Sequence, residues 1–187
     1  MIMGNELLEG EQVRLTAPTK ADLPLFARWF SNIDLLRLLG YAPVFPFTLQ
    51  DEEQWFAGQH KDGNFNFAVR TLEKDELIGS GSLKHLHWQA RHAELGINIG
   101  NPEFWGQGYG TDAIKVLLRY GFMEVNLNRI YLYVHSYNGR GIASYKKAGF
   151  TEEGRLRQEN YQDGAYHDTM IMGILRREWE AQENGVS

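Results

Sequence analysis

Apolar residues follow helical spacing most clearly in the second half of the chain, directly after a glycine-rich segment at 105–110. Counted from Ile114, they recur at the third, fourth, seventh, eighth and eleventh following positions, as far as Val125. This period gives a helix one continuous apolar face, so the pattern predicts a long amphipathic helix there. Further helices are expected over 22–30, 51–58 and 138–149.

Other segments alternate between apolar and polar residues, as half-buried strands do. Within 129–135, for example, Ile130, Leu132 and Val134 lie on one face and two tyrosines on the other. Strands are expected over 13–15, 65–69, 77–88, 94–100, 129–135, 150–153 and 166–175, with turns at 73–76 and 163–164. The order β-α-α-β-β-β-α-β-α-β-β predicts an α/β (α+β) fold with a mixed, largely antiparallel twisted sheet flanked by helices.

No internal repeat and no linker divides the 187 residues, a length usual for one domain. We therefore expect a single domain over residues 10–178 and a flexible polar tail over 179–187. Two prolines among aromatic residues predict an irregular but ordered connection over 41–47.

Composition narrows the function classes. The chain has no cysteine, which excludes disulfides, zinc–thiolate sites, iron–sulfur ligation and a cysteine nucleophile. A net charge of −5 argues against nonspecific nucleic-acid binding. No apolar run is long enough to cross a membrane, and the N-terminus lacks the basic region of a signal peptide. These features predict a soluble cytoplasmic protein without membrane or nucleic-acid partners.

The glycine-rich segment Trp105-Gly-Gln-Gly-Tyr-Gly110 stands between a predicted strand and a predicted helix. The free N–H groups and the dipole of a helix start favour an anion, and Thr111 adds a hydroxyl. Position 111 breaks the G-x-G-x-x-G dinucleotide pattern, and the chain has no G-K-[S/T] triplet of a P-loop. The residues alone leave two interpretations, a pyrophosphate site and a tight strand-to-helix turn.

With two later segments, this loop resembles the GNAT-type N-acetyltransferases. The segments are Asn138-Gly-Arg-Gly-Ile-Ala-Ser-Tyr145-Lys-Lys-Ala-Gly149-Phe150 and Asp163-Gly-Ala-Tyr166-His-Asp168. The likeness runs from about residue 12 to 178 and is strongest to the branch with ribosomal-protein and spermidine acetyltransferases. Trp105 stands where the family often has Arg or Gln, a change of little consequence for a loop that binds through its backbone.

The resemblance implies transfer of an acetyl group from acetyl-CoA to a primary amine, by direct attack within a ternary complex. It leaves the acceptor open among a polyamine-like amine, an aminoglycoside-like amine and a protein N-terminus, and it is compatible with a homodimer. It also implies an outward bulge in the strand before the loop. The residues implied to bind the cofactor are Asn98, Ile99, Gly100, Trp105, Gly106, Gln107, Gly108, Tyr109, Gly110, Thr111 and Asn138.

Two residues match the family's catalytic positions. Tyr145 corresponds to the general acid that protonates the leaving thiolate, although a tyrosine on a short helix also suits a core position. Glu94, 14 residues before Gly108, corresponds to a general base. It equally suits a solvent-facing strand residue or an ion-pair partner of Arg91, and many family members use a water chain instead.

Other interpretations stay open, among them the same fold with another acyl donor such as succinyl-CoA. A non-catalytic acyl-CoA-binding sensor would keep the cofactor loop, but the presence of Tyr145 and Glu94 favours an enzyme. His85 and His87 have an H-x-H spacing that can bind metal, but no carboxylate or cysteine stands at a fitting distance, so no metal is expected. Under the resemblance, Tyr41, Phe45 and Phe47 fall at one wall of the acceptor site, and local core packing is the other interpretation.

Overall fold

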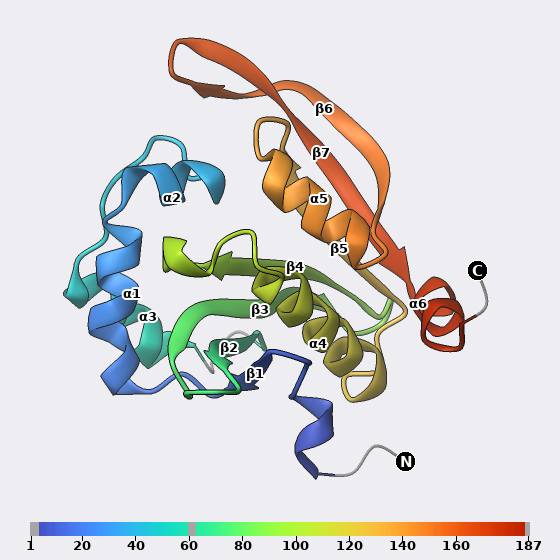
Figure 1. The fold of residues 1–187 in the computed structure, drawn as a ribbon. Helices are drawn as coiled ribbons and strands as arrows, with labels where there is room; N and C mark the ends of the chain where they lie inside the picture. The colour runs from blue at the N-terminus through green and yellow to red at the C-terminus, as the bar shows by residue number, and fades with distance from the viewer. Residues whose placement is uncertain (1–3, 60–62, 186–187) are drawn as a thin grey trace.

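The computed structural model describes residues 4–59 and 63–185, and within them seven strands form one sheet (Figure 1). The strands lie in the order β1-β2-β3-β4-β5-β7-β6. Their bounds are β1 (Val13–Thr16), β2 (Phe65–Thr71), β3 (Leu77–His87), β4 (His92–Ile99), β5 (Arg129–His135), β6 (Thr151–Gln162) and β7 (Ala165–Leu175). The helices are α1 (Leu23–Phe30), α2 (Ile33–Leu38), α3 (Leu49–Gly58), α4 (Tyr109–Met123), α5 (Gly139–Lys147) and α6 (Arg176–Glu183).

All neighbouring strands are antiparallel except β4 and β5, which are parallel. The predicted mixed, largely antiparallel sheet is therefore confirmed. The parallel ladder is short, since it runs only from His92–Arg129 to Glu94–Tyr131. After Glu94 the two strands part, and helices α4 and α5 begin beside the gap (Figure 1).

Two hydrophobic cores occupy the two faces of the sheet, because successive strand residues point to opposite sides. Phe67 and Val69 of β2 belong to the larger core, which also receives residues of α4, α5 and α6. Ala68, between them, belongs to the smaller core, formed with α1, α2 and α3. None of the helices in the described residues is long and apolar enough to cross a membrane.

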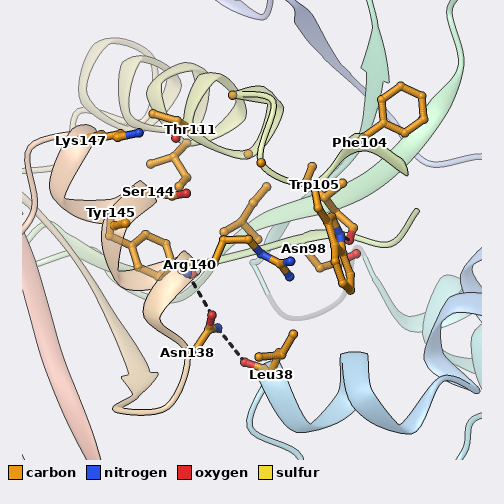
Figure 2. A pocket seen from close by; sticks show the side chains of 18 of the residues that line it. Leu38, Asn98, Phe104, Trp105, Thr111, Asn138, Arg140, Ser144, Tyr145 and Lys147 are labelled. Carbon is orange, nitrogen blue, oxygen red and sulfur yellow. Dashed lines mark hydrogen bonds between the residues drawn. The ribbon is translucent and has the colours of Figure 1, made fainter. Parts of the chain in front are cut away.

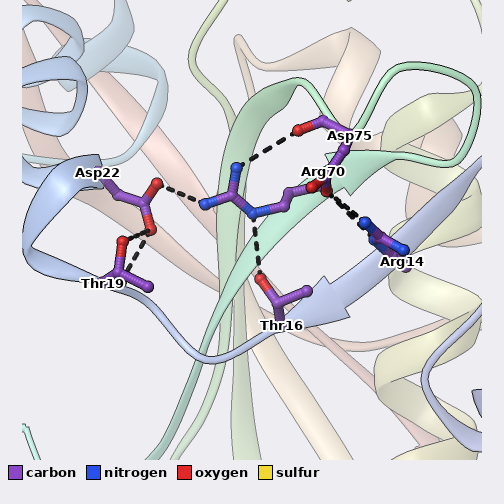
Figure 3. Close-up of polar contacts among 6 residues, drawn as sticks. All are labelled: Arg14, Thr16, Thr19, Asp22, Arg70 and Asp75. Carbon is purple, nitrogen blue, oxygen red and sulfur yellow. Dashed lines mark hydrogen bonds and ion pairs between the residues drawn. The ribbon is translucent and has the colours of Figure 1, made fainter.

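A polar network holds the start of α1 against the sheet (Figure 3). The buried carboxylate of Asp22 pairs with the Arg70 guanidinium of β2 and accepts the backbone N–H of Thr19 at 2.8 Å. Arg70 also donates to the Thr16 hydroxyl at 3.3 Å and to the Asp75 carbonyl at 3.4 Å. The network thereby joins α1 to β1 and β2.

Three expectations require correction. Helix α2 was not predicted, because six residues are too few to display a helical period. Strand β6 is much longer than the predicted 150–153. The prediction missed its extension because that part is a polar, exposed edge strand without alternation. Residues 179–183, expected to be the start of a flexible tail, are instead part of helix α6. Trp179 in this helix is only 7% exposed, and its ring packs on that of Phe122.

Asp112 fixes the first turn of α4 to the chain segment before β1. Its buried carboxylate accepts the backbone N–H groups of Glu11, Gln12 and Val13 at 3.0, 2.8 and 3.0 Å. A carboxylate near a helix N-terminus is also favoured by the helix dipole. This one side chain therefore sets the position of the helix start that follows the glycine-rich segment.

We expect Asp112→Ala to lower the free energy of unfolding by roughly 2–4 kcal/mol, because three backbone donors lose a charged acceptor. Urea unfolding of both proteins measures the difference. Asp34→Ala removes a carboxylate that is 85% exposed and should change stability by less than about 0.5 kcal/mol. A loss in Asp112→Ala no larger than in that control would contradict a structural role for the carboxylate.

Candidate active site

The gap between β4 and β5 opens a cavity of about 220 Å³ between the starts of α4 and α5 (Figure 2). Residues of the glycine-rich segment form one wall, and helix α5, along its length as far as Lys147, forms the other. Eight of the predicted cofactor-binding residues line it: Asn98, Ile99, Trp105, Gly106, Gly108, Gly110, Thr111 and Asn138.

The glycine loop has the geometry of an anion site. Gly106 and Gly108 adopt φ angles of 75° and 96°, a region that residues with a side chain rarely occupy. Gly108 is the N-cap of α4, and no side chain caps the first turn of that helix. Gly108, Gly110 and Thr111 line the cavity, so the N–H groups and dipole of this helix start lie at its edge, an arrangement that favours an anion.

A cation–π contact spans the cavity between its two walls (Figure 2). The Arg140 guanidinium of α5 lies 3.8 Å from the centroid of the Trp105 ring. The Trp105 indole N–H donates to the Ile99 carbonyl at 2.6 Å, which fixes the ring against the end of β4. A tryptophan at the start of the loop therefore has a contact that Arg or Gln could not make in the same way.

Asn138 both caps α5 and joins it to α2. Its side-chain oxygen accepts the Gly141 N–H at 2.9 Å, and its amide donates to the Leu38 carbonyl at 3.1 Å (Figure 2). A Cβ atom at position 141 would lie within 3.0 Å of the Asn138 side chain. Glycine at 141 therefore permits the cap, although the residue is a poor helix former.

Tyr145 of α5 lines the cavity while its ring packs into the larger core. The residue is 9% exposed, and its ring contacts that of Phe150 with centroids 5.9 Å apart. Burial raises the pKa of Tyr145 to about 12. The hydroxyl group therefore keeps its proton at neutral pH, as a proton donor must.

Three predicted cofactor residues lie outside the cavity lining. Gly100 packs against the indole of Trp29, where a Cβ atom would overlap the ring. The Gln107 amide donates to the Glu103 carbonyl. The Tyr109 ring packs on that of Phe104, with the two ring centroids 5.1 Å apart.

The expected bulge in β4 is also absent from this part of the described chain. Pairing with β3 is regular from Gly79–Ile99 to Lys84–Glu94, and the irregularity lies beyond, between Lys84 and His87. The opening arises instead because β5 diverges from β4.

A larger cavity of about 650 Å³ adjoins the first and shares Leu39, Ile97 and Asn98 with it. Its walls come from α1, α3, the 41–47 connection and strands β2, β3 and β4. Tyr41 and Phe47 line it and contact each other with centroids 5.2 Å apart. Phe45 is 77% exposed and belongs to neither this lining nor a core.

Asn98 stands where the two cavities meet and has an unused acceptor. Its amide nitrogen donates to the Ser80 hydroxyl at 2.6 Å. Its side-chain oxygen is buried and has no partner among the described residues. A buried acceptor of this kind can receive a donor from a bound molecule.

Glu94 lines neither cavity. Its carboxylate pairs with Lys84 Nζ at 3.0 Å and with His85 Nδ1 at 3.0 Å. The alternative partner Arg91 instead donates to the Asn126 carbonyl at 2.8 Å. In the described part of the chain, no group of three or more His, Asp or Glu residues could hold a metal ion.

Sequence reasoning missed Glu52, in the first turn of α3. The residue lines the larger cavity and is only 5% exposed. Burial, and secondarily the charge of Asp51, raise the pKa of Glu52 to about 7. An acidic residue in the first turn of a helix is commonplace, so only the tertiary packing reveals its burial.

Comparisons with known proteins agree with this architecture. A family model described as an acetyltransferase (GNAT) domain matches residues 12–151. A spermidine N(1)-acetyltransferase of Vibrio cholerae is 32% identical over 171 residues, covering 90% of this chain and 95% of that protein. YdaF of Bacillus subtilis, whose name proposes a ribosomal N-acetyltransferase, is 37% identical over 112 residues, 60% of this chain and 61% of that protein.

Among solved structures, the spermidine N-acetyltransferase of Vibrio cholerae in complex with CoA and spermine has a TM-score of 0.81 and 29% identity. The alignment covers 90% of this chain and 98% of that one. Because the matched residues include the glycine loop and Tyr145, the likeness extends to the site, and the protein is an acetyltransferase whose acetyl donor is acetyl-CoA. It belongs to the GNAT family and is an N-acetyltransferase.

The raised pKa of Glu52 predicts a pH-dependent stability. The folded state favours the protonated carboxyl, so this group costs stability as pH rises from its ordinary pKa of 4.5 to about 7, and the cost is complete above 7. We expect the free energy of unfolding of Glu52→Gln to be higher than that of the wild type by roughly 1–3 kcal/mol at pH 8. This gain in stability should vanish near pH 4.5. Urea unfolding at pH 5 and 8 measures it, with exposed Glu53→Gln as control. An equal gain at both pH values would contradict the prediction.

Proposed function

We propose that the protein transfers the acetyl group of acetyl-CoA directly to a primary amine while both substrates are bound. The observation that carries this proposal is the junction of the two cavities at Leu39, Ile97 and Asn98. A thioester in the smaller cavity and an amine in the larger one would meet there without a covalent enzyme intermediate. Alignment of bound reactants in this way supplies a large part of the rate enhancement.

The lining of the larger cavity supports a small cationic acceptor, with a polyamine as the first candidate. Aromatic rings and the carboxylates of Asp51 and Glu52 line it, and Lys84 is the lining's one basic side chain among the described residues. Carboxylates and aromatic faces both attract an ammonium group. The spermidine acetyltransferases among the relatives carry polyamines in their names, which agrees with this choice.

The chain's own groups suit the steps of this transfer. The first turn of α4 would hold the pyrophosphate, and the unpaired edge of β4 after Glu94 would receive the pantetheine arm. The Asn98 side-chain oxygen would accept an N–H of the incoming amine. As the C–S bond breaks, the Tyr145 hydroxyl, which carries its proton at neutral pH, would donate that proton to the thiolate.

The reaction also needs a base that deprotonates the amine. Glu94 or a chain of water molecules is the expectation from the family resemblance. The two ion pairs of Glu94 and its position outside the cavity lining favour the water chain over this residue.

Release of free thiol from acetyl-CoA across a panel of amines tests the proposed function. The panel holds spermidine, spermine, aminoglycosides, amino acids and short peptides with Ser or Ala N-termini. We expect saturable release with the polyamines. Saturable release only with peptides would move the acceptor to a protein N-terminus. No release with any amine, despite tight binding of acetyl-CoA in calorimetry, would favour an acyl-CoA sensor.

We expect Tyr145→Phe to lower kcat at least about tenfold and to leave acetyl-CoA affinity nearly unchanged, because only the hydroxyl proton is lost. Steady-state kinetics and calorimetry measure the two quantities. Tyr133→Phe is a matched control, since that ring is half exposed and lines neither cavity. An unchanged kcat in Tyr145→Phe would reduce the residue to a packing role.

A further inference from the structure

Attack by an amine requires a neutral nitrogen, and an alkylammonium group has a pKa of about 10.4. At neutral pH almost every acceptor molecule therefore arrives with one proton too many. A proton acceptor must therefore be available in the space that the amine occupies, either a protein group or water that leads to one. The inference below rests on the proposed function.

Glu52 is the carboxylate best situated in that space. It lines the larger cavity, which also contains Asn98 at the junction with the acetyl-CoA site. It is 5% exposed, and no described residue makes a hydrogen bond or ion pair with its carboxylate. Glu94, by contrast, already pairs with the side chains of Lys84 and His85 and lies outside the lining.

The neighbouring Asp51 shows how differently the fold treats two adjacent acids. The Asp51 carboxylate accepts the Thr48 backbone N–H at 2.7 Å and the Thr48 hydroxyl at 2.6 Å, which lowers its pKa. Burial raises the pKa of Glu52 to about 7. Environments that separate the pKa values of two acids in this way are typical of acid–base sites.

The groups that surround Glu52 are few. Besides Asp51, the titratable residues of the cavity lining are Tyr41, from the connection after α2, and Lys84 of β3. The charge of Glu52 contributes to the raised pKa of Tyr41, after burial. Helix α1 presents only the rings of Phe26 and Phe30 to this lining.

We propose that Glu52 is the proton acceptor for the amine that attacks acetyl-CoA. The ionised carboxylate takes one proton from the ammonium group, directly or through one water molecule, and becomes a neutral carboxylic acid. The free lone pair then forms the C–N bond to the thioester carbon. When the C–S bond breaks, the thiolate receives a proton from Tyr145, and the second amine proton passes through water to the Tyr145 phenolate and restores its hydroxyl. The Glu52 proton finally returns to solvent.

The pH dependence of kcat/KM for spermidine tests this role in the wild type, Glu52→Gln and Glu94→Gln. We expect the wild type to lose activity below about pH 7, because the acceptor carboxylate becomes protonated. Glu52→Gln should lower kcat at pH 7.5 at least about 30-fold, leave the KM for acetyl-CoA unchanged and remove this acidic limb. Glu53→Gln changes an exposed acid on the same helix that lines neither cavity, and should match the wild type.

Three outcomes would overturn the proposal. The acidic limb could persist in Glu52→Gln, or it could vanish in Glu94→Gln instead. The KM for spermidine could rise in Glu52→Gln while kcat stays unchanged, which would make the carboxylate a binding group for the cation. These results differ from a failure of the proposed function, in which the wild type itself releases no thiol with any amine.

A second acceptor separates proton transfer from structural damage. Methoxyamine carries an unprotonated nitrogen at neutral pH and needs no base. We expect Glu52→Gln to lose less than about threefold in kcat with this acceptor, and circular dichroism to report an unchanged fold. Equal losses with methoxyamine and spermidine would overturn the role in proton transfer.

Discussion

The separation of β4 from β5 is the constraint on which the rest of the molecule depends. Two parallel strands stay joined through only three residue pairs, so the facing edges beyond them lack partners in the sheet. Backbone N–H and C=O groups need partners, and an amide-rich ligand arm lying in the gap can supply them. A parallel pair also requires a crossover, and helix α4 provides it. The starts of α4 and α5 therefore meet at the gap.

The second substrate site has a different physical origin. Helices α1 and α3 cover the opposite face of the sheet and leave a large space lined by aromatic rings, carboxylates and a few strand residues. Its position relative to the gap depends on close contacts, such as Gly100 against Trp29 and Asp22 against Arg70. Glycine at 100 is thus required by packing, because a Cβ atom there would overlap the Trp29 ring.

Sequence predicted the parts of this structure that local patterns encode. The period of α4, the alternation of β5 and the glycine loop with its following helix are properties of neighbouring residues, and the observed bounds of β5 match the predicted ones. Helix α2 was too short to show a period, and the polar β6 shows no alternation. Helix α6 is almost entirely polar, so its one buried residue, Trp179, gives no visible pattern.

The candidate site follows the same division. The residues along the loop and at the start of α5 could be listed from motifs, since each binds through its local backbone or caps its own helix. Glu52 could not, because its burial depends on α1, the 41–47 connection and the sheet packing around it. The pairing of Glu94 with Lys84 and His85 likewise depends on the register of β3 and β4.

The bonds of Asp112 have a consequence for the order of events during synthesis. The segment that satisfies this carboxylate lies about 100 residues earlier in the chain, so it leaves the ribosome long before α4 does. Contacts between such distant segments form late in folding, because the intervening loop must first close. The nascent chain therefore acquires a properly positioned α4 start only when its first strand has docked. The proposed pyrophosphate site at this helix start would therefore be absent from any chain that ends before Asp112.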